Sequence, residues 1–137
     1  GRAVFCHAGD SRVYHLTAGQ SLVQLTEDHT HAGWLLRQGR ITERIFRNHP
    51  ARHQLEMALG GRHQKVDPQA GSLSVATGDR FILCTDGLVE GLWDNTLFHY
   101  LVDPPPRVAG QQPARRLVEE SLSVSGRDNT TVIVLEL

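Results

Sequence analysis

The stretch 81–87, which reads F-I-L-C-T-D-G, constrains the fold of this chain more than any other. Its first four residues are apolar with no alternating polar partner, a pattern typical of a β-strand buried on both faces. The apolar run ends abruptly at Asp86 and Gly87. Because a lone carboxylate at the end of a buried strand is costly unless something binds it, Asp86 is expected to accept hydrogen bonds, to cap a helix or to hold a cation.

The overall composition argues against several classes of protein. The chain has 137 residues and a net charge of −1, which gives no electrostatic signature for nucleic acid or an anionic membrane. No apolar run approaches the ~20 residues that span a bilayer. The first residues look like the inside of a strand, not like a signal peptide. Cys6 and Cys84 lie in apolar runs and are expected as buried free thiols. We therefore expect a cytoplasmic protein with no nucleic-acid or membrane partner.

Short apolar segments between turn residues predict the strands of an α+β fold. The first three are expected to form an antiparallel meander, and the stretch after Arg80 is expected to be the central strand. Because strands and helices do not alternate strictly, the pattern favours antiparallel layers over a parallel sheet. The expected strands are 2–8, 12–16, 22–26, 72–75, 81–85 and 130–137.

Helices are expected in two places. Residues at about 30–56 are polar, rich in His and Arg, and predicted to form a surface excursion with two short helices. Thr30 is expected to cap the first of these helices, and the second should end near Arg47. Later in the chain, Asp94 is predicted to cap a helix, and Pro113 suits the first turn of another.

Three aspartates follow or precede predicted strands beside small or turn-forming residues: Asp10, Asp86 and Asp128. By the two-residue period of a strand, Asp10 should share a face with Cys6, and Asp86 should share one with Cys84. If the strands are neighbours, the carboxylates converge at one rim and need cations. All-oxygen ligands suit Mg²⁺ or Mn²⁺. A turn-forming role for each aspartate remains equally open on spacing alone.

Five segments give these residues a family context. Each is common by itself, but in this order they resemble the metal-dependent protein serine/threonine phosphatases of the PPM (type 2C) family, especially its compact bacterial members. The resemblance runs from about residue 3 to the end of the chain. The segments are Gly9-Asp10-Ser11-Arg12, Leu25-Thr26-Glu27-Asp28-His29-Thr30, Ala58-Leu59-Gly60-Gly61, Cys84-Thr85-Asp86-Gly87-Leu88 and Asp128-Asn129-Thr130-Thr131-Val132.

The resemblance implies an α-β-β-α sandwich of two antiparallel sheets flanked by helix pairs. Residues 1–137 would be the C-terminal part of a single phosphatase domain. In the family, two metal ions activate a water molecule for direct attack on a phosphoserine or phosphothreonine ester. The complete domain would hold two to three Mg²⁺ or Mn²⁺ ions.

The resemblance also assigns roles to individual residues. Asp86 and Asp128 match carboxylates that hold the second ion, and Asp10 matches one that shares a third, weaker ion with Asp86. The excursion at about 30–56 corresponds to a flap, and Arg52 and His53 match flap positions near the substrate.

The family motif D-G-M-G-G, which carries the bridging aspartate, does not occur in this chain. We therefore expect the N-terminal portion of the domain to be missing, and this fragment to be inactive alone although its parent is a phosphatase. Strand edges left open could pair two copies into a homodimer. The alternatives are a non-catalytic, pseudophosphatase-like binding or regulatory module and, more remotely, a phosphatase acting on anti-sigma antagonists.

Other polar candidates are weaker. His29 and His31 are two residues apart and conceivable as a metal pair, but a surface or capping role fits their loop-to-helix position better. Arg115 and Arg116 are expected on the solvated face of the last helix. The serines and cysteines of this chain have no Ser-His-Asp or Cys-Arg signature around them that would indicate a covalent nucleophile.

Overall fold

A computed structural model describes residues 1–19, 21–60 and 66–137, and these form two compact units. The larger unit comprises Gly1, Arg12–Leu25 and Val75–Leu137, and the smaller comprises Arg2–Ser11 and Thr26–Ser74. Gly61, the last residue of one family-like segment, lies outside the described residues. Every strand pair in the described residues is antiparallel, which confirms the predicted α+β class with antiparallel sheets.

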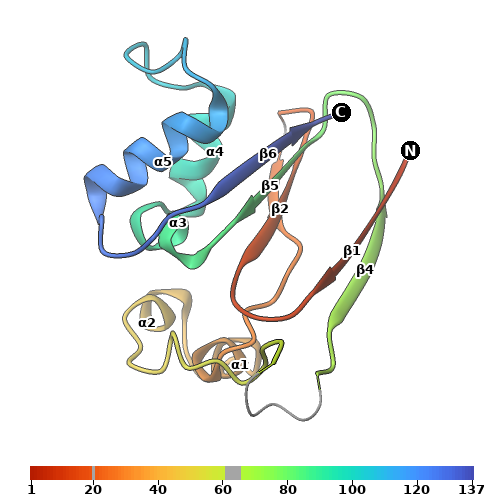
Figure 1. The fold of residues 1–137 in the computed structure, drawn as a ribbon, viewed down its shortest axis with the longest axis vertical. Coiled ribbons are helices and arrows are strands. Elements are labelled where there is room, and N and C mark those ends of the chain that lie inside the picture. Colours follow the sequence, from red (N-terminus) through yellow and green to blue (C-terminus); the bar gives the residue numbers. More distant parts are fainter. Residues whose placement is uncertain (20, 61–65) are drawn as a thin grey trace. The chain divides into compact units, whose positions relative to one another are not determined.

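The larger unit contains a four-stranded sheet in the order β3-β2-β5-β6. Figure 1 shows helices α3, α4 and α5 on one face of this sheet. The predicted central strand is indeed internal, since β5 lies between β2 and β6. The elements are β2 (Arg12–Thr17), β3 (Ser21–Gln24), β5 (Arg80–Cys84), α3 (Asp86–Gly91), α4 (Asp94–Val102), α5 (Pro113–Val124) and β6 (Val132–Glu136).

The core of the larger unit lies between this sheet and its helices. Alternate residues of the strands face inward, so Tyr14 and its register partner Ile82 are both fully buried. Leu88, Leu101 and Leu117 meet them from the three helices. Burying such side chains stabilises the fold by roughly 1.5–3 kcal/mol each. Cys84, the last residue of β5, and Leu88 of α3 belong to the same core.

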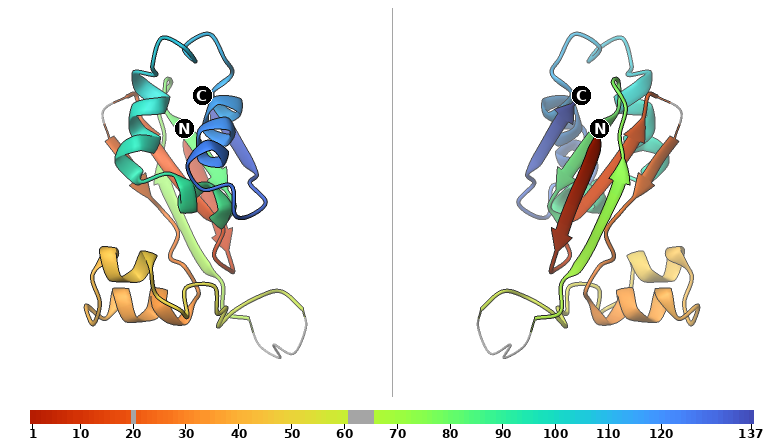
Figure 2. Two further views of the ribbon diagram at one scale, coloured as in Figure 1. Left: turned by 90° about the vertical axis from the view of Figure 1, so that its left-hand side faces the viewer. Right: turned by 90° about the vertical axis from the view of Figure 1, so that its right-hand side faces the viewer.

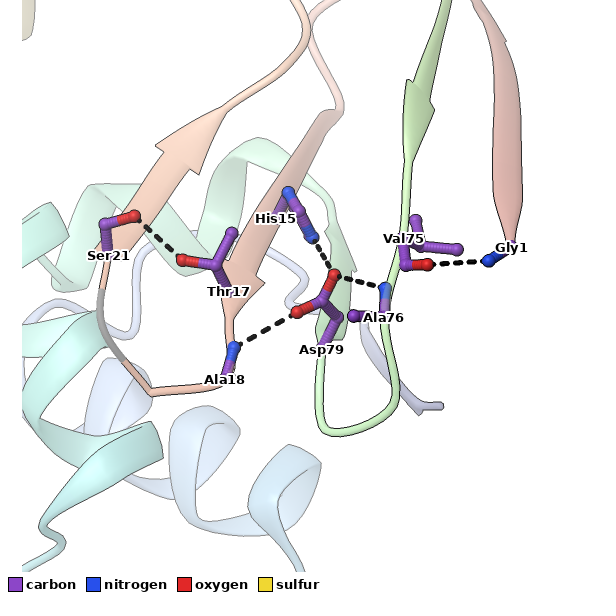
Figure 3. A network of polar contacts seen from close by, with 8 residues as sticks. All are labelled: Gly1, His15, Thr17, Ala18, Ser21, Val75, Ala76 and Asp79. Carbon is purple, nitrogen blue, oxygen red and sulfur yellow. Dashed lines mark hydrogen bonds and ion pairs between the residues drawn. The ribbon is translucent and has the colours of Figure 1, made fainter.

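A carboxylate joins two turns at the end of this sheet where β2 finishes and β5 begins. Asp79 accepts hydrogen bonds from Nε2 of His15 and from the backbone N–H groups of Ala18 and Ala76, at 3.0, 3.2 and 3.0 Å (Figure 3). The His15 ring also stacks on Phe81, with 4.8 Å between ring centroids. Nearby, Gly1 and Val75 exchange two hydrogen bonds between backbone groups.

The smaller unit pairs β1 (Arg2–His7) with β4 (Gln69–Ser74), and Figure 2 shows the two strands side by side. It also contains α1 (His31–Arg37) and α2 (Glu43–Arg47), which are the two helices expected in the excursion. The Thr30 hydroxyl caps α1 by accepting a hydrogen bond from the Gly33 N–H at 3.0 Å, as predicted.

The structure corrects several sequence predictions. The first three strands are not one meander, because β1 pairs with β4 in a separate sheet while β2 pairs with β3 and β5. Hydrophobic alternation locates strands but does not choose their partners. Asp94 is the first residue of α4 rather than its cap, a position that Trp93 takes. Cys6 is exposed although Cys84 is buried as expected. None of the helices described is long and apolar enough to cross a membrane.

Arg116 is a further correction. Its side chain is buried, and Nη2 donates to the carbonyl oxygen of Leu101 at 3.2 Å, so it does not lie on a solvated face. Burial lowers the pKa of this guanidinium, with a smaller contribution from nearby Arg80. Arg115, in contrast, is exposed and pairs with Glu119 one turn later at 2.7 Å.

Candidate metal centre

Asp86 occupies the first position of helix α3, and only Thr85 separates it from the end of strand β5. The chain therefore turns at Thr85, which is the N-cap residue, and the strand period that placed Asp86 on the same face as Cys84 does not extend this far. Asp86 is consequently not the cap itself. A carboxylate in the first turn of a helix is favoured by the partial positive charge of the backbone N–H groups there.

Asp128 lies in the segment between α5 and β6, on the surface. Its Oδ1 atom accepts a hydrogen bond from the N–H of Asn129 at 2.7 Å, and its carbonyl oxygen accepts one from the Thr130 hydroxyl at 3.4 Å. The first of these contacts orients the carboxylate relative to its own backbone. It reaches only the next residue, whereas the side chain of a turn-forming aspartate typically bonds the backbone two residues on, and it leaves the second carboxylate oxygen to be considered as a metal ligand.

Hydrogen bonds join the segments that carry these two aspartates. The N–H of Thr85 donates to the carbonyl oxygen of Thr131 at 3.1 Å, and the N–H of Thr131 donates back to Oγ1 of Thr85 at 3.0 Å. The Thr85 hydroxyl in turn donates to the carbonyl oxygen of Asn129 at 3.3 Å. The residue before Asp86 is thus bound to the residues that follow Asp128.

Two further contacts fix the first turn of α3. Gly87 packs so closely on the 129–130 segment that a Cβ atom would lie 2.5 Å from the carbonyl oxygen of Asn129, so only glycine fits without a shift. From the other side, the buried Ser121 hydroxyl of α5 contacts the carbonyl oxygens of Gly87 and Leu88 at 2.9 and 3.1 Å. Sequence reasoning gave Thr85 no role of its own, although it lies in the segment Cys84-Thr85-Asp86-Gly87-Leu88, and it missed Ser121, which lies outside all five family-like segments.

Asp10 belongs to the smaller unit and lies beyond the end of β1. The strand period that was expected to align it with Cys6 stops at His7, and Gly9 follows with a φ of 123°, a conformation that favours glycine. The backbone there is well held: the N–H of His29 donates to the carbonyl oxygen of Gly9 at 2.9 Å. Asp10 therefore sits on an ordered turn rather than on a strand face.

Two histidines, which the sequence analysis did not group, hold this turn. The N–H of Gly9 donates to Nδ1 of His29 at 3.2 Å, and Nε2 of His7 lies 3.1 Å from the carbonyl oxygen of Gly9. Burial, with a smaller contribution from His7, lowers the pKa of His29, which favours the neutral ring that can accept from Gly9. His31 has a different partner, Oε1 of Glu56 at 2.9 Å, so each ring of the conceivable His29–His31 metal pair is engaged elsewhere.

Arg52 and His53 lie in the smaller unit just after α2. Nη1 of Arg52 donates to the carbonyl oxygen of Arg47 at 2.9 Å, so part of this guanidinium stabilises the end of the helix. His53 is exposed. Their suggested role toward a substrate stays a prediction.

The donor chemistry of these positions fits a hard divalent cation. Asp86 and Asp128 offer carboxylate oxygens on segments that are hydrogen-bonded to each other, and the small residues Thr85 and Gly87 flank Asp86. Oxygen donors of this kind suit Mg²⁺ and Mn²⁺. The residues present are therefore compatible with such an ion in the larger unit.

Comparison with known proteins identifies the class of molecule. The chain is 39% identical over 131 residues to the serine/threonine protein phosphatase PstP of Mycobacterium tuberculosis, a match that covers 96% of this chain and 24% of PstP. It is 33% identical over 135 residues to the serine/threonine phosphatase Stp of Listeria welshimeri, covering 98% of this chain and 52% of Stp. No protein-family model matches the sequence.

Solved structures agree with these relatives. The crystal structure of the M. tuberculosis phosphatase PstP/Ppp matches with a TM-score of 0.84 at 39% identity, over 99% of this chain and 55% of that one. A structure of the PstP catalytic domain in complex with two manganese ions matches with a TM-score of 0.79 at 38% identity, over 98% and 53%.

The chain is therefore homologous, over nearly its whole length, to bacterial serine/threonine protein phosphatases of the PPM family. It spans about half the length of Stp and of the matched solved chains, and about a quarter of PstP.

Proposed function

We propose that this chain is part of a Mg²⁺- or Mn²⁺-dependent phosphatase that hydrolyses phosphoserine and phosphothreonine in proteins. The observation that carries the proposal is the hydrogen-bonded junction at Thr85, which holds the segments of Asp86 and Asp128 together in a chain 39% identical to PstP. Asp86 and Asp128 would hold one ion, and Asp10 would share another with Asp86. Two such ions, when bound, supply an activated water and neutralise charge on the phosphoryl oxygens.

The protein's own residues supply position and charge. Asp86 and Asp128 bring negative charge to a place where backbone and hydroxyl contacts fix their segments, which lowers the cost of ordering the ligands when an ion binds. Arg52 and His53, on the flap at about 30–56, are proposed to lie near the phosphoprotein and help to orient it. Since the ions would activate the water, no serine or cysteine nucleophile is required.

Several finer features belong to the same proposal. Residues 1–137 would be the C-terminal part of a single phosphatase domain, whose complete form is an α-β-β-α sandwich. The fragment alone would have little or no activity, and its open strand edges could pair two copies into a homodimer. A cytoplasmic location rests on the two cysteines, which are both free thiols.

Phosphate release by the protein encoded by the complete gene tests the proposal. With Mn²⁺ and a phosphothreonine peptide we expect turnover that EDTA abolishes. Asp86→Asn and Asp128→Asn should each lower kcat/KM by at least about 100-fold, since even outer partners of metal ligands cost 10–100-fold. Asp103→Asn, an exposed aspartate at the end of α4, is the matched control and should leave activity unchanged.

The competing hypothesis is a pseudophosphatase-like module that binds phosphoproteins without hydrolysing them. It gains its only support from the absence of a D-G-M-G-G segment in these 137 residues. Binding of the phosphopeptide without phosphate release at saturating Mn²⁺ would favour this module and contradict the phosphatase. Residues 1–137 alone should release no phosphate in the same assay.

A further inference from the structure

The Thr85 hydroxyl lies at the junction between the two segments that carry Asp86 and Asp128. Strands β5 and β6 stay paired as far as Cys84 and Val132, and Thr85 is the next residue on β5's side. Beyond this last pair, one hydrogen bond between backbone groups remains, from the N–H of Thr85 to the carbonyl oxygen of Thr131 at 3.1 Å. The side chain of Thr85 adds two more contacts, one to Thr131 and one to Asn129.

These contacts reach the Asp128 carboxylate through a single residue. The carbonyl oxygen of Asn129 accepts from the Thr85 hydroxyl at 3.3 Å, while the N–H of Asn129 donates to Oδ1 of Asp128 at 2.7 Å. Asn129 is therefore held at one end by Thr85 and holds Asp128 at the other. Thr85 is also covalently bonded to Asp86, so one hydroxyl connects the two carboxylates by a short path on each side.

We propose that Thr85 is a positioning residue for the metal site. Its hydroxyl sets the separation and orientation of the Asp86 and Asp128 carboxylates, and through them the affinity for the divalent cation. This inference rests on the proposed function. It adds Thr85 to the candidate metal site, which the sequence had limited to carboxylates. The role assigned to Thr85 acts through the two carboxylates and involves no contact of its own with the substrate.

The close contact at Gly87 makes the position of Asp86 sensitive to any movement of residues 129–130. Because the backbone of α3 lies against the 129–130 segment with no room for a Cβ atom, a small displacement of Asn129 changes the approach of the whole first turn. Removing the hydroxyl leaves the Thr131 N–H and the Asn129 carbonyl without this side-chain partner. Both groups lie near the surface, so water can replace the lost contacts, and the chain is expected to fold.

Three variants of the complete protein separate positioning from stability. Thr85→Val keeps the shape and removes the hydroxyl, while Thr85→Ser keeps the hydroxyl and removes only a methyl group. Thr17→Val is the matched control. Thr17 is the last residue of β2, a neighbour of β5 in the four-stranded sheet, and its hydroxyl contacts the hydroxyl of Ser21 at 3.0 Å (Figure 3). Thr85→Ala replaces Thr85→Val if the valine variant does not fold.

The measurements are the Mn²⁺ dissociation constant, from calorimetric titration, and KM for a phosphothreonine peptide at saturating Mn²⁺. We expect Thr85→Val to weaken Mn²⁺ binding about 10-fold, the lower end of the range for outer partners of metal ligands. KM at saturating metal should stay within about twofold, because the role assigned to the hydroxyl is to position metal ligands and not to bind the substrate. Thr85→Ser and Thr17→Val should bind Mn²⁺ as the wild type does.

The outcomes distinguish this inference from the proposed function. If the wild type hydrolyses the peptide with Mn²⁺ but Thr85→Val binds Mn²⁺ with unchanged affinity, the positioning role is wrong and the phosphatase stands. If Thr85→Ser or Thr17→Val weakens binding as much as Thr85→Val, the effect is general and the positioning role is again wrong. If the wild type neither binds Mn²⁺ nor releases phosphate, both proposals fail.

Discussion

Nε2 of His15 and Oδ2 of Asp79 lie 3.0 Å apart, and both side chains are more than nine-tenths buried. Since a carboxylate can only accept, the imidazole donates this hydrogen bond. The same carboxylate receives the N–H groups of Ala18 and Ala76, so one aspartate joins strand β2, the turn after it and the turn before β5. This arrangement predicts a specific dependence of stability on pH.

Asp79→Asn should lower the free energy of unfolding at neutral pH and lower it less in acid. The Ala76 N–H first, and then His15, hold the pKa of the Asp79 carboxyl below its ordinary value. A carboxyl with a lowered folded-state pKa contributes stability above its unfolded pKa, and this stability is lost as pH falls through the folded value. Urea midpoints of wild type and variant should therefore begin to converge as the pH falls below about 4, the ordinary pKa of an aspartate.

The exposed Asp103 provides the control for this pH dependence. Asp103→Asn should differ little from wild type across the same range, because a surface carboxylate contributes little. A difference between wild type and Asp79→Asn that stays constant from pH 7 to pH 3 would contradict the assignment.

Gly87→Ala should destabilise the larger unit by about 1–3 kcal/mol, the usual cost of forcing extra volume into a packed contact. The added Cβ atom meets the carbonyl oxygen of Asn129, a backbone atom that cannot rotate away. Chemical denaturation measures the loss. Gly110→Ala is the control, since a Cβ atom there meets nothing within 4 Å, and it should change the free energy of unfolding by less than about 0.5 kcal/mol.

Ser121→Ala should cost about 1–3 kcal/mol of unfolding free energy, because two buried carbonyl oxygens at the start of α3 lose a hydroxyl contact. Ser123→Ala on the same helix is the matched control: its hydroxyl donates to Glu120 within α5 and is exposed. Equal effects of the two substitutions on the urea midpoint would show that Ser121 does not anchor α3.

The sequence predicts local features of this fold well. Helix α1 begins where Thr30 caps it, α5 begins at Pro113, and β5 is an internal strand, because each of these depends on a few neighbouring residues. Strand partners are not local. The pairing of β1 with β4 joins residues about 70 positions apart, and nothing in either segment specifies the other.

The same distinction holds for the candidate site. Asp86 and Asp128 stand out because each marks the end or start of an apolar run. The contacts that connect them do not, because Thr85 reaches Asn129 and Thr131 across 44 and 46 residues, and Ser121 reaches Gly87 across 34. The burial of Arg116 was also not predictable, since its place on the inner face of α5 depends on Leu101 of another helix.

The most direct test of the central claim is an anomalous difference map at the manganese edge from crystals of the complete protein grown with Mn²⁺. We expect a manganese peak with carboxylate oxygens of both Asp86 and Asp128 within about 2.5 Å, the range of hard-cation ligands. A map from protein that releases phosphate in the presence of Mn²⁺, with manganese bound elsewhere and none at these two carboxylates, would contradict the account.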